Sequence, residues 1–126
     1  MSWNQLHERM AFMADLIDRG AEDPAAALHF NGNTADVQRL FGGEEGLLLA
    51  LRHRWVTMLT ARLDQADHEG IPAAVAVARR NAEHPGLRAL LDVAEHRSIR
   101  VAALRRSEER IVALHDGNDP GRATVA

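Results

Sequence analysis

Seven histidines are the residues of this sequence best suited to metal binding or proton transfer. Helical metal sites place two ligands three or four residues apart, so that both reach one face of the helix. Two Asp–His pairs have the four-residue spacing, Asp64 with His68 and Asp92 with His96. Because such a pair is more often a surface ion pair, we predict no metal site and no cofactor, and a metal-binding helical module stays an alternative.

The residue types needed for nucleophilic or phosphate chemistry are largely missing. Cysteine is absent, which excludes thiolate nucleophiles, thiolate zinc sites and disulfides. Lysine is absent too, since all fifteen strongly basic residues are arginine, and this removes Schiff-base and P-loop lysine mechanisms. A composition rich in arginine and alanine is typical of a high-GC bacterial genome. No serine or threonine has a nucleophile-elbow context. We therefore expect a protein that is not an enzyme.

The composition favours an all-α fold. The 126 residues are 46% hydrophobic and 26% charged, which is ordinary for one globular domain. Aromatic residues make up only 4%, so the chain lacks the β-branched and aromatic runs that strands need. We predict a single compact helical bundle of five to seven helices over residues 1–115, with a disordered tail over residues 116–126. No long apolar run and no secretory signal are present, so we expect no membrane span and a cytoplasmic location.

The first helix is predicted from an apolar residue at every third or fourth position: Trp3, Leu6, Met10, Met13 and Ile17. Ser2 and Gln5 have the spacing of a capping box at its start, and Gly20 is expected to end it. Because the stripe is continuous, we expect all of it to be buried against the core.

A long central helix is predicted over residues 44–69, where it would measure roughly 39 Å. Its apolar face carries Leu48, Leu51, Trp55, Met58, Leu59 and Leu63. Shorter helices are expected on either side of it. They cover residues 24–30, 34–41, 72–83 and the stretch from 86 to the tail, the last with a break near Ser98.

Five residues are candidates for a pocket or a subunit interface: Trp55, Met58, Leu59, Val75 and Leu91. Trp55 has Arg52, Arg54 and Arg62 around it, which fits core packing with the arginine heads reaching solvent. It also fits an anchor in a dimer interface. We expect a homodimer or a complex with another protein, paired through the helix from Pro72 or those after Gly86. A small apolar ligand is an alternative occupant.

Charge is distributed unevenly along the chain. Residues 1–46 hold three arginines and eight acids, a balance of −5, whereas the last thirty hold six arginines and four acids, a balance of +2. This pattern argues against nucleic acid as a partner of the first half, because a duplex would repel it. The opposite charges also favour packing between the two ends. We expect a solvated helix face for Arg97, Arg100, Arg105, Arg106 and Arg110, with Glu108 and Glu109 as partners.

Two segments carry a resemblance to a known family. Residues 40–51, read LFGGEEGLLLAL, resemble the junction between the recognition helix and the fourth helix of TetR-type transcriptional repressors. Residues 82–92, read AEHPGLRALLD, resemble a stretch of the ligand-binding half of that family. The resemblance implies a helical regulatory scaffold, dimeric and built to bind a partner or a ligand.

The segment that would read DNA departs from this family. Gln38 stands where the family has an aromatic residue, and Glu44 and Glu45 follow where a basic residue meets phosphate. We therefore predict a shortened TetR-like scaffold without functional DNA recognition, acting as a binding or regulatory protein. The alternative is a TetR-like DNA-binding repressor, whose reading residues would be Asn33, Thr34, Gln38 and Arg39.

Overall fold

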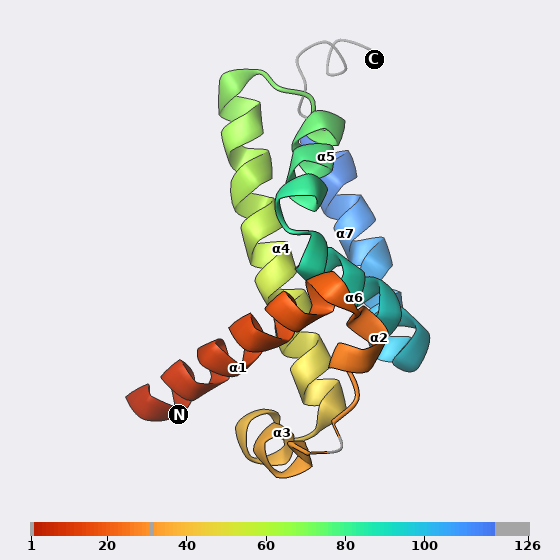
Figure 1. Cartoon of the computed structure of the whole chain (residues 1–126). Helices are drawn as coiled ribbons and strands as arrows, with labels where there is room; N and C mark the ends of the chain where they lie inside the picture. Colours follow the sequence, from red (N-terminus) through yellow and green to blue (C-terminus); the bar gives the residue numbers. More distant parts are fainter. Residues whose placement is uncertain (1, 31, 118–126) are drawn as a thin grey trace.

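The computed structural model describes residues 2–30 and 32–117, and these residues fold into seven α-helices without a strand (Figure 1). The predicted all-α helical bundle is thus confirmed. No helix in these ranges combines the length and apolar character that crossing a bilayer requires. The helices are α1 (Trp3–Glu22), α2 (Pro24–Ala27), α3 (Thr34–Phe41), α4 (Glu44–Glu69), α5 (Ala73–Glu83), α6 (Pro85–Arg97) and α7 (Ile99–Gly117).

Capping hydrogen bonds and backbone preferences of single residues determine where most of the helices begin and end. The predicted capping box is present, since the Gln5 amide donates to Ser2 Oγ and the Ser2 amide donates to Gln5 Oε1, both at 3.1 Å. Asp23 caps α2, which ends at Ala27 and is therefore shorter than predicted. Gly70 ends α4 in the left-handed region, at φ 73°.

The central helix α4 organises the packing. It contacts α3, α5, α6 and α7, and α1 packs across α6 (Figure 1). The larger core cluster surrounds the first half of α4, and a smaller one joins its second half to α5. Trp55 belongs to the larger cluster, and its side chain is fully buried.

The last two helices meet at the predicted break. Ser98 lies between α6 and α7 in an extended conformation, and its hydroxyl accepts from the Val101 amide. Helix α7 continues through Gly117, two residues into the predicted tail, and residues 118–126 lie outside the described residues.

Two arginines of the basic last part of the chain pair with the acidic start of α4. Arg97 Nη1 lies 3.2 Å from Glu44 Oε1, and Arg100 Nη1 lies 3.9 Å from Glu45 Oε2. These arginines are therefore partners of the acidic start of α4, where negative charge also suits the helix dipole.

The prediction for the first helix is wrong in two respects. Helix α1 runs past Gly20 to Glu22, because Gly20 packs against Leu90 of α6 instead of ending the helix. The apolar stripe is buried only from Met13 onward. Its first members are in solvent, with exposed fractions of 72% for Trp3, 42% for Leu6 and 50% for Met10.

Glycine makes the crossing of α1 and α6 possible. A Cβ at Gly86 would lie 2.4 Å from the Ile17 carbonyl oxygen, and a Cβ at Gly20 would lie 2.5 Å from Leu90 Cγ. The two helices could not approach this closely with larger residues at these positions. The crossing thus fixes the direction in which α1 leaves the bundle.

We predict that Gly86→Ala destabilises the protein by about 1–3 kcal/mol, because its methyl group forces α6 away from the α1 backbone. Gly32→Ala is the matched control, since no atom lies within 4 Å of its Cβ position. Urea unfolding followed by circular dichroism measures both. If Gly86→Ala is as stable as the parent, the close crossing is contradicted, because alanine is otherwise the better helix former.

Candidate functional site

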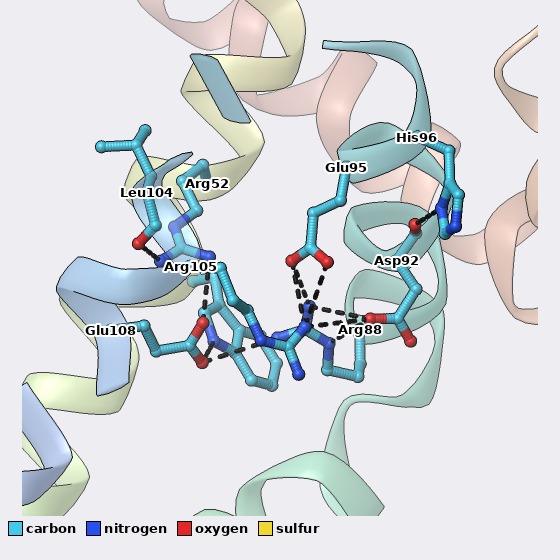
Figure 2. A network of polar contacts seen from close by, with 9 residues as sticks. Arg52, Arg88, Asp92, Glu95, His96, Leu104, Arg105 and Glu108 are labelled. Carbon is cyan, nitrogen blue, oxygen red and sulfur yellow. Dashed lines mark hydrogen bonds and ion pairs between the residues drawn. The ribbon is translucent and has the colours of Figure 1, made fainter. Parts of the chain in front are cut away.

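A buried carboxylate joins α4 to α7. Glu108 is 7% exposed, and its two oxygens accept from different donors of α4: Oε1 from Trp55 Nε1 at 2.7 Å and Oε2 from Arg52 Nη1 at 2.9 Å. Arg52 also donates to the Leu104 carbonyl (Figure 2). Burial lowers the pKa of Arg52, and the charge of Glu108 opposes that effect. The expected solvated roles of Glu108 and of Arg52 are therefore wrong.

The network extends toward the surface through α6. Arg88 lies over the Trp55 ring, with Cζ 5.0 Å from the ring centroid, and its guanidinium reaches Glu108, Asp92 and Glu95. Arg105 of α7 binds Glu95 at 3.0 Å (Figure 2). Because each of these carboxylates is paired with an arginine, we assign the network to holding α4, α6 and α7 together.

An open groove lies between α1 and α4, with a volume of about 670 Å³. Its apolar surface comes from Met10, Leu6 and Met13 of α1 and from Leu49, Ala50 and Met58 of α4. Its polar lining is Arg9, His53, Arg54 and Thr57, so the groove carries positive charge and no carboxylate. The exposed stripe of α1 forms one wall of this groove.

The groove contains one of the five predicted pocket or interface residues, Met58. Trp55, Leu59 and Leu91 are 0% exposed and belong to the core, so the interpretation of these three as interface residues is wrong. All three are large apolar residues on helix stripes, a pattern that is equally typical of a core. Val75 is 39% exposed on α5.

The candidate DNA-reading residues lie in and beside α3. Arg39 binds Glu8 of α1 at 2.8 Å and Asp36 at 3.1 Å, and these hydrogen bonds raise its pKa. The Thr34 hydroxyl donates to the Phe30 carbonyl. Asn33 Oδ1 is buried without a partner, and Gln38 lines a cleft with Glu44. The Thr34 hydroxyl and the Arg39 guanidinium are thus engaged with neighbouring residues, and both partners of Arg39 are carboxylates.

The predicted Asp–His pairs are replaced by other contacts. His96 Nδ1 lies 2.8 Å from the Asp92 backbone oxygen, not from its carboxylate. Asp64 approaches His115 of α7 rather than His68, with 3.5 Å between Oδ1 and Nε2, and His115 Nδ1 lies 2.5 Å from Asp67. Asp64, Asp67 and His115 form one group in the described part whose atoms could bind a divalent ion. Their mutual pairing holds the end of α7 against α4.

Sequence reasoning missed the buried charges, although a signal for them was present. Glu108 falls within the apolar stripe of α7, three and four residues from Ile111 and Leu104. Arg80 likewise continues the buried positions Ala73 and Ala76 of α5. A charged residue at a stripe position indicates a buried ion pair or a binding site rather than a solvated face.

No family model, no curated protein and no solved structure matches this chain. The resemblance to TetR-type regulators therefore stays an interpretation of two sequence segments. A functional site is accordingly inferred from the geometry of the groove and from the charges around it.

We predict that Glu108→Ala costs about 3–5 kcal/mol of stability, because it leaves the Arg52 charge buried without its partner. The neighbouring Glu109 is exposed, so Glu109→Ala is the matched control and should change stability by less than about 0.5 kcal/mol. Urea unfolding measures both variants. If Glu108→Ala and Glu109→Ala lowered the free energy of unfolding equally, the buried carboxylate would not be what joins the helices.

Proposed function

We propose that this protein is a non-enzymatic binding or regulatory module that works as a homodimer joined through the groove between α1 and α4. The observation that carries the proposal is the exposed stripe of α1. Trp3, Leu6 and Met10 continue a stripe that is buried from Met13 onward, and Leu6 and Met10 line an apolar groove. Large apolar residues gathered beside a groove mark an interaction surface, whereas scattered ones do not.

A second copy of the chain fits this surface best. The exposed ridge and the groove belong to the same face, so a two-fold axis would place the ridge of each protomer in the groove of its partner. The other exposed apolar residues, Val75, Ile99 and Leu114, lie on α5 and α7 and do not line the groove.

The regulatory part of the proposal draws on the resemblance to TetR-type proteins, which implies a dimeric helical scaffold. The DNA-binding alternative is weaker, since Arg39 is held by two carboxylates and the start of α4 is acidic. A small apolar ligand is the second candidate occupant. The groove volume of about 670 Å³ lies within the usual range for ligand sites.

We predict that Leu6→Asp weakens self-association at least about tenfold, because dimerisation would then bury an unpaired carboxylate. The side chain is 42% exposed in the monomer, so the helical circular dichroism spectrum should be retained. Ile99→Asp is the control, because it introduces the same change at an 89% exposed residue outside the groove. It should leave the molecular mass in solution equal to that of the parent. Sedimentation equilibrium over a range of concentrations gives the mass of all three proteins.

A parent protein that stays monomeric at high micromolar concentration would refute the dimer. Native mass spectrometry of the freshly purified protein then tests the second candidate. A retained small apolar molecule that is lost in Met58→Asp would indicate a ligand site, and its absence would refute that candidate as well.

A further inference from the structure

A small cavity of about 50 Å³ lies between the second half of α4 and α5, away from the α1–α4 groove. Two facing helix stripes build it. Residues 62, 65, 66 and 69 lie on one face of α4, and residues 76, 79 and 80 lie on one face of α5. Arg79 and Glu69 are exposed, so the cavity opens to the surface at these side chains.

One wall of the cavity is a buried arginine with unused donors. Arg80 is 1% exposed, and its Nε and Nη2 atoms have no hydrogen-bond partner. Its Cζ lies 4.9 Å from the centroid of the Trp55 ring. The face of the ring stabilises the cation, but it offers no acceptor to the N–H donors in the plane of the guanidinium. A buried charge of this kind requires a partner, and burial accordingly lowers the pKa of Arg80.

The side chains around Arg80 add positive charge. Three arginines and one carboxylate line the cavity, which is an excess of two positive charges. Arg62 binds Glu83, and Glu69 accepts from Gln65 at 3.0 Å rather than from an arginine. Within the described residues, Arg79 has no ion pair, so its guanidinium is free to act beside Arg80.

We propose that this cavity between α4 and α5 is a binding site for a small oxyanion, held by Arg80 from inside and by Arg79 at the surface. A guanidinium presents its donors in a planar fork that matches two oxygens of a phosphate or a sulfate. The cavity has room for about three or four water-sized groups, which suits such an ion or a terminal phosphoryl group but not a whole nucleotide. The site is independent of the proposed dimer.

The test is titration of the full chain with sodium sulfate and with inorganic phosphate, at constant ionic strength set with chloride. Isothermal titration calorimetry should give saturable binding of both anions. Arg79→Gln replaces the exposed, charged guanidinium by a neutral amide and should weaken binding about tenfold without affecting the fold. The matched control is Arg106→Gln on the exposed face of α7, which should bind as the parent does. Titration with methyl phosphate distinguishes the two sources of the oxyanion. If the site takes the head group of a larger ligand, methyl phosphate should bind at least as well as inorganic phosphate.

A second measurement reports on the site itself. Burial, and then repulsion by Arg80, lowers the pKa of His84 at the end of α5. A bound sulfate would offset that repulsion, so NMR titration should give a higher pKa for His84 with saturating sulfate than with chloride.

Absence of saturable binding below about 50 mM anion would overturn the proposal. Equal weakening by Arg79→Gln and Arg106→Gln would also overturn it, because this would show general screening instead of a site. The same holds for a pKa of His84 that sulfate leaves unchanged.

Discussion

The close crossing of α1 and α6 determines the shape of this molecule. Gly86 admits the α1 backbone and Gly20 admits Leu90, so α1 is fixed across the bundle at its second half. Its first half is consequently directed away from the bundle (Figure 1). The space that remains between α1 and α4 is the groove. The apolar stripe of α1 is longer than the part that the monomer can bury, and this excess is the physical basis for the proposed self-association.

Arginine takes an unusual part in the interior. Arg52 and Arg88 bring their charges to Glu108, and the Trp55 ring lies within about 5 Å of two guanidinium groups. Such a network favours one arrangement of α4, α6 and α7, because moving any of these helices leaves a buried charge unpaired. Arg80 shares the contact with Trp55, but its Nε and Nη2 atoms have no hydrogen-bond partner, and the proposed anion would supply one.

Features set by neighbouring residues could be predicted from the sequence. The capping of α1 by Ser2, the cap of α2 at Asp23, the end of α4 at Gly70 and the break at Ser98 all follow from local hydrogen bonding and backbone preference. The candidate site could be predicted only in part. Met58 was identified as a pocket residue, but nothing local distinguishes the buried half of the α1 stripe from the exposed half, because burial depends on where α6 crosses.

The partners of the buried charges could not be predicted, for a related reason. The sequence shows that Glu108 and Arg80 interrupt apolar stripes, but the partner of each comes from a distant part of the chain or is missing. Pairing over such distances is fixed by tertiary packing, which periodicity does not encode. The family resemblance could not supply it either, since its two segments cover only the junction of α3 and α4 and the junction of α5 and α6.

Hydrogen exchange as a function of protein concentration tests the central claim, that the unburied half of α1 is a self-association surface. A dimer protects the amides that it covers, and by mass action this protection grows with concentration. We expect exchange over residues 3–13 to slow as the concentration rises, whereas exchange over α7 stays constant. Exchange over residues 3–13 that is the same at every concentration would contradict the claim.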